Sequence, residues 1–171
     1  MRFISDFEIV KGTYGTPTII IYDDNGNSRY VDWDQYSGRI IERMKIDTRH
    51  RIKHPGIIIG RDFQTRQLLV VHNHIDAGGA FIDTYSGFTK GTRTWFSVRE
   101  CTNTRLRAVE IALEHVISRD FYRPFSYNCQ TLESRACDNS SYSYDGSRIL
   151  GNILGVGLGV AFVYAIAQTG R

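Results

Sequence analysis

Two runs of branched residues decide the fold that the sequence predicts: HPGIIIG at 54–60 and LLVVHNH at 68–74. A short polar link, 61–67, separates them, which is typical of an antiparallel hairpin with largely buried strands. His54 begins the first strand, and His72 ends the second. Because an antiparallel hairpin brings the start of one strand beside the end of the other, we expect the two imidazoles to be neighbours.

The remaining strands are predicted from turn residues and β-prone runs. Asn25-Gly26 lies between two such runs and predicts a second hairpin at 18–33, inside a β-rich N-terminal lobe that spans 1–36. Residues 37–46 favour a short helix over a strand. A turn follows at Gly78-Gly79, and a loop from 84 to 98 leads into one more strand.

Two helices are expected in the second half of the chain. The first is capped by Thr102 or Asn103 and ends near Arg119. The second runs from Thr131 to Cys137, and Cys129 lies at its start. The first amides of a helix have no partners inside it and carry partial positive charge, so a thiol there loses its proton readily. Cys129 is therefore a candidate nucleophile.

Composition and cysteine count exclude several classes of protein. The 171 residues are 42% hydrophobic, enough for one packed domain, and the net charge of +3 is too small to argue for a nucleic-acid partner. The three cysteines have no CxxC spacing, which predicts reduced thiols and a reducing, cytoplasmic compartment rather than a disulfide framework or a zinc site. Residues 1–10 lack a continuous apolar stretch, so we expect no cleavable secretory signal.

The C-terminal segment has the length of a membrane span. The run ILGNILGVGLGVAFVYAIA at 149–167 holds no charge, and at about 1.5 Å per residue it just crosses a hydrocarbon layer of about 30 Å. A glycine-rich helix buried in the core is the alternative. We expect a domain at 1–147 and a membrane-inserted tail at 148–169. Three glycines of the tail share one helical face, which favours a homo-oligomer: Gly151, Gly155 and Gly159.

A thiol, an imidazole and a third polar group that orients the imidazole make a nucleophilic site. Cys129, His54 and His72 supply these three parts. His74 competes with His72 for the third position, because two residues apart on a strand they point to the same face. Cys101 and Cys137 have no such context and are interpreted as ordinary cysteines.

The segments at 54–60, 69–72 and 128–129 resemble the signature of the lecithin retinol acyltransferase-like proteins. These proteins are a branch of the NlpC-type, circularly permuted papain-like superfamily, and the branch includes phospholipase/acyltransferases and picornaviral 2A proteins with a histidine box and an Asn-Cys motif. The resemblance covers about residues 50–137. It implies an α+β fold with an antiparallel sheet packed on helices, followed by a hydrophobic C-terminal helix.

Carried over to this chain, the resemblance makes Cys129 the nucleophile, His54 the principal histidine and His72 the third residue. It implies a membrane-associated hydrolase or acyltransferase that cleaves phospholipid esters through an acyl-thioester, without metal or cofactor. A cysteine peptidase or amidase of the same superfamily is the alternative enzyme. The family continues Asn-Cys with Glu-His-Phe, whereas this chain has Gln130-Thr131-Leu132. That departure motivates a third reading, a non-catalytic membrane-bound interaction protein, viral or effector, that keeps the fold.

Overall fold

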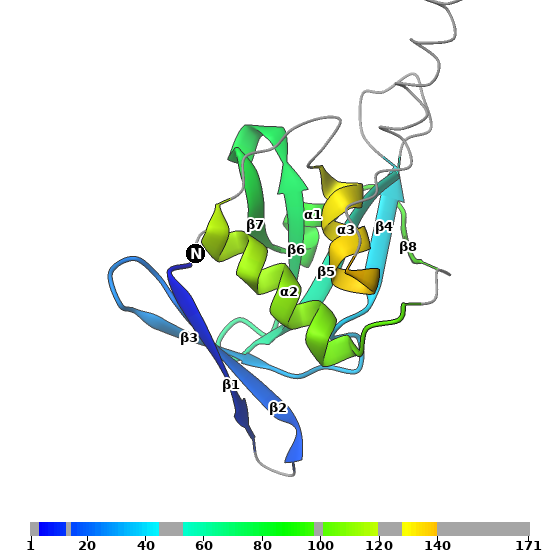
Figure 1. Ribbon diagram of the computed structural model, residues 1–171. Coiled ribbons are helices and arrows are strands. Elements are labelled where there is room, and N and C mark those ends of the chain that lie inside the picture. Colours follow the sequence, from blue (N-terminus) through cyan, green and yellow to red (C-terminus); the bar gives the residue numbers. More distant parts are fainter. Residues whose placement is uncertain (1–3, 13–14, 45–52, 98–100, 120–127, 140–171) are drawn as a thin grey trace, which may run out of the picture.

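The computed structural model describes residues 4–12, 15–44, 53–97, 101–119 and 128–139. This part of the chain is an α+β fold with one eight-stranded sheet, so the predicted class is confirmed at that level (Figure 1). Every strand pairing in the sheet is antiparallel. Within the described ranges no helix is long and apolar enough to cross a bilayer, and the predicted tail at 148–169 lies outside them.

The sheet has the strand order β1-β2-β3-β5-β4-β8, and β6 pairs with both β5 and β7. The strands are β1 (Asp6–Lys11), β2 (Pro17–Tyr22), β3 (Ser28–Asp32), β4 (Ile40–Met44), β5 (Lys53–Asp62), β6 (Leu68–His74), β7 (Gly79–Thr84) and β8 (Thr94–Phe96). The helices are α1 (Tyr85–Thr89), α2 (Arg105–Ser118) and α3 (Cys129–Asp138), with a short 3-10 helix, η2 (Ile75–Ala77).

Both predicted hairpins are present. β2 and β3 pair with Ile20 opposite Tyr30, and Gly26 in their turn has a φ of 77°, which glycine adopts without steric cost. β5 and β6 pair with Ile57 opposite Val71. The two hairpins could be predicted because the turn residues and the β-prone strands on either side of them indicate the same structure.

The predicted helix at 37–46 is wrong, because its central residues form β4. β4 lies between β5 and β8, and even Glu42 and Arg43 on it are buried. A strand that is covered on both faces shows no alternation of polar and apolar residues, so its sequence cannot be distinguished from a helix by period. β7 and the five-residue helix α1 were not predicted either.

Helices cover both faces of the central strands. On one face α2 and α3 pack against β5 and β6, where Leu113 and Leu132 meet Ile57 and Val71 in the larger core cluster. On the other face α1 contributes Phe88 to a smaller cluster that includes Ile41, Ile58 and Val70. Figure 1 shows α2 and α3 in front of the sheet and α1 behind it.

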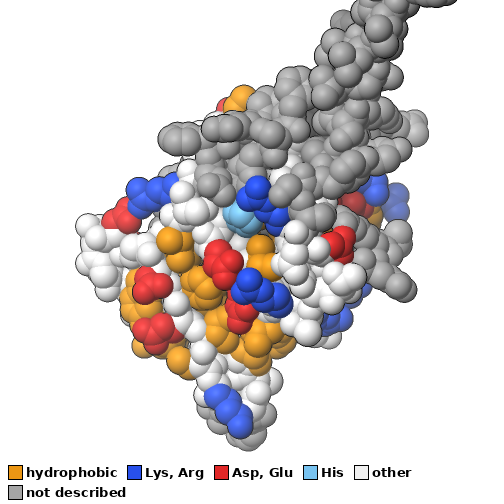
Figure 2. Space-filling model, in the orientation of Figure 1, with side chains coloured by type: hydrophobic (Ala, Val, Ile, Leu, Met, Phe, Trp, Pro, Cys, Tyr) orange, Lys and Arg blue, Asp and Glu red, His pale blue; other side chains and the backbone are white. Residues whose placement is uncertain are grey.

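The outer surface of α2 carries charges of both signs. Arg107 forms ion pairs with Glu110 and Glu114, each with an N–O distance of 3.1 Å. On the face of the molecule that carries α2, acidic and basic side chains are interspersed with hydrophobic ones (Figure 2). The helix is thus amphipathic, with its charged side toward solvent and its apolar side on the sheet.

Candidate functional site

His54 and His72 are in direct contact inside the protein. His54 Nε2 lies 3.0 Å from His72 Nδ1, and the two side chains are 2% and 1% exposed. Strand pairing explains the contact, because β5 begins where β6 ends. The prediction that the hairpin makes these imidazoles neighbours is confirmed.

The carboxylate of Asp83, on the neighbouring strand β7, lies close to His72 on the side away from His54. Asp83 Oδ2 of β7 lies 3.6 Å from His72 Nε2. A Cβ at Gly87 of α1 would overlap the Asp83 carboxylate, so glycine there leaves room for it. Burial lowers the pKa of His72 below its ordinary value, and the nearby Asp83 opposes that change. Sequence reasoning missed Asp83, because β7 itself was not predicted.

His74 has different partners from His72. Its Nδ1 accepts a hydrogen bond from the amide of Asp76 at 3.2 Å and caps η2, and the Asp76 carboxylate lies 3.4 Å away. The His74 ring centre is 5.9 Å from that of His54, whereas His72 Nδ1 lies 3.0 Å from His54 Nε2. Geometry therefore favours His72 as the partner of His54.

Cys129 is the first residue of α3 and is 7% exposed, so the helix begins two residues earlier than the predicted Thr131. The side chain of Asn128 caps the helix and accepts hydrogen bonds from the amides of Gln130 and Thr131 at 2.9 and 3.2 Å. The thiol therefore lies at the positive end of a helix dipole, which favours the thiolate.

The first turn of α3 lies at the end of the sheet where β4 and β6 finish and β5 begins (Figure 1). His54 and His72 lie at that end on the α1 face, where His54 stacks on Phe88 and His72 meets the same ring edge-on, whereas Leu132 and Ala136 of α3 pack on the opposite face. Cys129 thus begins its helix at the same end of the sheet as the two histidines (Figure 1). The catalytic roles of the three residues stay a prediction.

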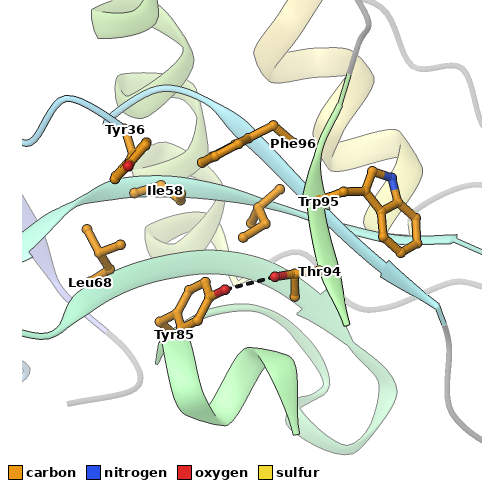
Figure 3. Close-up of a pocket in the computed structure, with 8 residues that line it drawn as sticks. Tyr36, Ile58, Leu68, Tyr85, Thr94, Trp95 and Phe96 are labelled. Carbon is orange, nitrogen blue, oxygen red and sulfur yellow. Dashed lines mark hydrogen bonds between the residues drawn. The ribbon is translucent and has the colours of Figure 1, made fainter. Parts of the chain in front are cut away.

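A cavity of about 300 Å³ opens on the same sheet face as the histidines (Figure 3). Its walls come from β4, β5, β6, β8, α1 and the segment before β4, and they are mostly apolar: Tyr36, Ile41, Ile58, Leu68, Tyr85, Thr94, Trp95 and Phe96. The hydroxyl groups of Tyr85 and Thr94 form a hydrogen bond of 2.8 Å across it. Ile58 is four residues along β5 from His54, a separation of roughly 13 Å.

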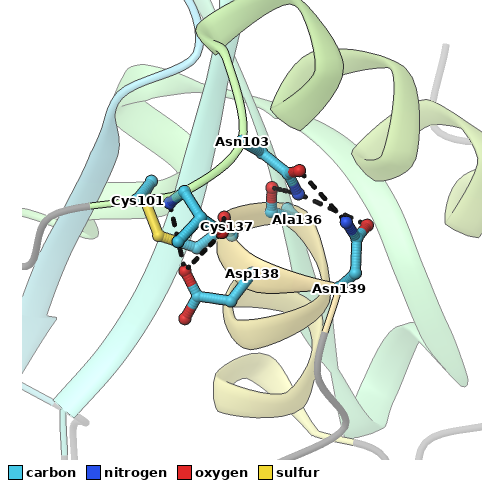
Figure 4. Close-up of a disulfide and its surroundings, with 7 residues drawn as sticks. Cys101, Asn103, Ala136, Cys137, Asp138 and Asn139 are labelled. Carbon is cyan, nitrogen blue, oxygen red and sulfur yellow. Dashed lines mark hydrogen bonds between the residues drawn. A yellow bond between two sulfur atoms is a disulfide. The ribbon is translucent and has the colours of Figure 1, made fainter.

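The prediction of three reduced cysteines is wrong for two of them. Cys101 and Cys137 form a disulfide, with their Cα atoms 4.7 Å apart, and Cys129 is the free thiol (Figure 4). Pairing was missed because 36 residues separate the two cysteines and only the packing of α2 on α3 brings them together. The expectation of a reducing compartment loses this premise and stays a prediction.

Hydrogen bonds reinforce the disulfide at the C-terminal end of α3. The amide of Asn103 donates to the Cys137 carbonyl at 2.9 Å, and Asn103 Nδ2 donates to the Ala136 carbonyl at 2.9 Å. Asn139 Nδ2 donates in turn to Asn103 Oδ1 at 3.1 Å. Together with the disulfide, these hydrogen bonds hold the C-terminal end of α3 against the segment before α2. Cys129 lies at the other end of the same helix.

Among the described residues, no group of three or more histidine, cysteine, aspartate or glutamate side chains has an arrangement that would hold a metal ion. Comparison with known proteins finds no family model, no curated protein and no solved structure that matches the chain. Function is therefore argued from the site alone.

Proposed function

We propose that this chain is a thiol hydrolase or acyltransferase of the lecithin retinol acyltransferase-like type, with a circularly permuted papain-like fold, acting on phospholipid esters at a membrane. One observation carries the proposal: the buried contact of 3.0 Å between His54 Nε2 and His72 Nδ1, at the end of the sheet where Cys129 begins α3.

The groups next to the His54 and His72 rings determine which ring nitrogen carries the proton in each. The Asp83 carboxylate accepts only, and its Oδ2 is 3.6 Å from His72 Nε2, so we assign the His72 proton to Nε2 and leave Nδ1 as the acceptor. His54 Nε2–H then donates to His72 Nδ1. This tautomer leaves the lone pair of His54 on Nδ1, the nitrogen that acts as base toward the Cys129 thiol.

The reaction then proceeds in two steps, acylation of Cys129 and deacylation. His54 Nδ1 takes the Cys129 proton, the thiolate attacks the ester carbonyl, and the alcohol leaves with the proton from the imidazolium, which gives an acyl-thioester. Water, or an acceptor amine or alcohol, next gives its proton to His54 and attacks the thioester. The product leaves, and Cys129 Sγ takes the proton back.

The apolar cavity supports an acyl substrate. Its volume of about 300 Å³ is at the lower limit of small-molecule pockets, and Ile41, Ile58 and Phe96 provide walls without charge. The hydroxyls of Tyr85 and Thr94 share one hydrogen bond, which compensates part of the cost of desolvating them beside an alkyl chain. The predicted apolar tail at 148–169 would bring the site to lipid.

The test uses the purified chain and phosphatidylcholine vesicles, with fatty acid release and acylation of the Cys129 peptide followed by mass spectrometry. We expect both signals from the natural chain and neither from Cys129→Ser or His54→Gln. His115→Gln, a half-buried histidine of α2, is the matched control and should keep both signals. Full release by Cys129→Ser, or no release by the natural chain, would overturn the proposal. Cleavage of cell-wall peptides instead of vesicles would identify an amidase.

A further inference from the structure

Arg43 is a buried cation beside the two histidines. On β4 it lies directly opposite His54 of β5, and its side chain is 2% exposed. Its guanidinium carbon lies 5.5 Å from the ring centre of Phe88, the ring that also stacks on His54 and meets His72 edge-on. Strand register therefore places this positive charge on the face and at the end of the sheet where the histidines lie.

The known contacts of Arg43 leave its charge uncompensated. Nη1 donates to the carbonyl of Met44 at 3.1 Å, while the buried Nε has no hydrogen-bond partner. No carboxylate of the described residues forms an ion pair with it. Because a buried charge without a partner is costly, a guanidinium retained in this position needs a negative group nearby.

Cys129 lies at the end of the molecule where such a group is needed, because it begins α3 at the end of the sheet where β4, the strand of Arg43, finishes (Figure 1). Burial lowers the pKa of Arg43, and the negative charge of the Cys129 thiolate acts against that decrease. The interaction is reciprocal, so a cation that is stabilised by a thiolate stabilises the thiolate equally. Arg43 also acts on His72, whose pKa is lowered first by burial and in part by the Arg43 charge.

We propose that Arg43 is a positioning residue that holds Cys129 as a thiolate before any substrate arrives. Its role in catalysis rests on the proposed function, whereas the ionisation of Cys129 is measured without substrate. Arg43 thus acts with the end of α3: the helix amides and the guanidinium both place positive charge near Sγ.

Other titratable groups lie on the elements packed against α3. β5 carries Lys53, His54, Arg61 and Asp62, and β6 carries His72 and His74, with Asp83 beyond them on β7. α2 carries Arg105, Arg107, Glu110, Glu114 and His115; and α3 itself carries Glu133, Arg135 and Asp138. Glu110 and Glu114 are paired with Arg107. The experiment therefore compares single substitutions rather than absolute values.

The disulfide between Cys101 and Cys137 makes the measurement specific, because alkylation of the native, non-reduced protein reports Cys129 alone. Iodoacetamide rates are measured from pH 4 to 10 for the natural chain, Arg43→Met, Arg43→Lys and Arg39→Met. Arg39 is the matched control: its guanidinium stacks on Phe96 at 3.9 Å in the smaller cluster.

Arg43→Met should raise the apparent pKa of Cys129 and slow alkylation roughly tenfold at pH 6, the change expected for a rise of about one unit. Arg43→Lys should restore part of the rate, and Arg39→Met should match the natural chain. An unchanged pKa in folded Arg43→Met would mean that Arg43 only packs on Phe88, and the proposal would be wrong.

A second variant decides the matter if Arg43→Met does not fold. In His54→Gln the imidazole is gone and Arg43 remains, so the Cys129 pKa should stay below the ordinary value of about 8.5. A pKa at or above that value overturns the proposal. Lipid cleavage with an unperturbed thiol would contradict this inference alone, whereas a perturbed thiol without cleavage would contradict the proposed function alone.

Discussion

His72 Nδ1 lies 3.0 Å from His54 Nε2, whereas His74, on the same face two residues later, is bonded to the amide of Asp76 instead. The preferred histidine of the sequence and its competitor thus have different partners in space. The difference arises because β6 ends at His74, whose side chain then caps η2.

Substitution should therefore separate these two histidines. His72→Ala removes the acceptor that fixes the His54 ring, and we expect kcat/KM for ester cleavage to fall by roughly 10²- to 10⁴-fold, the range for loss of a positioned proton-transfer group. His74→Ala, the matched control, should change it less than about threefold. Equal losses in the two variants would mean that His72 has no special role.

Stability should depend on pH through His72. Burial lowers its pKa in the folded protein below the ordinary value of 6.5, so the unfolded chain binds more protons as the pH falls past that value. The free energy of unfolding should accordingly decrease from pH 7 to pH 5. In His72→Gln this slope should be shallower, as urea titrations at each pH will reveal. An identical slope would contradict the assignment of the slope to His72.

Asp62 should contribute to acid stability. Its side chain is buried; burial alone would raise its pKa, but hydrogen bonds from Arg29 and Thr65 lower the pKa to about 2. The resulting stability is present above the ordinary pKa of 3.8 and is lost as the pH falls toward 2. Asp62→Asn should cost about 2 kcal/mol at pH 7, as measured by urea unfolding.

A surface ion pair gives the control for Asp62. Asp24 Oδ1 and Arg119 Nη2 lie 2.6 Å apart, and both side chains are more than half exposed. Asp24→Asn should therefore cost less than about 1 kcal/mol. If the two substitutions cost the same, the buried hydrogen bonds of Asp62 contribute nothing beyond a surface pair.

The disulfide should be visible by counting thiols. One cysteine should react in the unfolded, non-reduced protein and three after reduction. Cys101→Ala should lower the free energy of unfolding by up to about 4 kcal/mol in the chain-entropy model for a loop of this length. Three reactive thiols before reduction would show that the bond is absent.

The cavity should select the acyl chain. Leu68→Trp enlarges a half-buried wall residue, and kcat/KM for decanoyl esters should fall by roughly tenfold or more, about 1.4 kcal/mol. Cleavage of acetyl esters should be unchanged. Phe63→Trp, at an exposed position on the connection between β5 and β6, is the control and should affect neither ester. A parallel loss for both esters would exclude a chain-binding role.

Local chemistry predicted the parts of the site that depend on neighbouring residues. Patterns within about twenty residues predict the Asn-Gly turn, the β5–β6 hairpin, the contact between His54 and His72 and a helix that starts near Cys129. These features are predictable because turn residues and strand composition act locally.

The parts that the sequence did not predict depend on contacts between distant segments. Arg43 reaches the site only because β4 pairs with β5, and Asp83 only because β7 pairs with β6. Cys101 meets Cys137 only when α2 packs on α3. In each case the neighbouring sequence does not indicate the contact, which depends on a segment that is distant in the chain.

The bulge near Gly60 divides β5 into two parts that pair with different strands. Before it, β5 pairs with β4 and carries His54; after it, Arg61 and Asp62 pair with β3 of the N-terminal lobe. A Cβ at Gly60, whose φ is 153°, would lie 2.7 Å from Val31 Cγ1. The register of β5 therefore shifts at a residue that cannot be enlarged, and this one strand holds His54 at one end and pairs with the N-terminal lobe at the other.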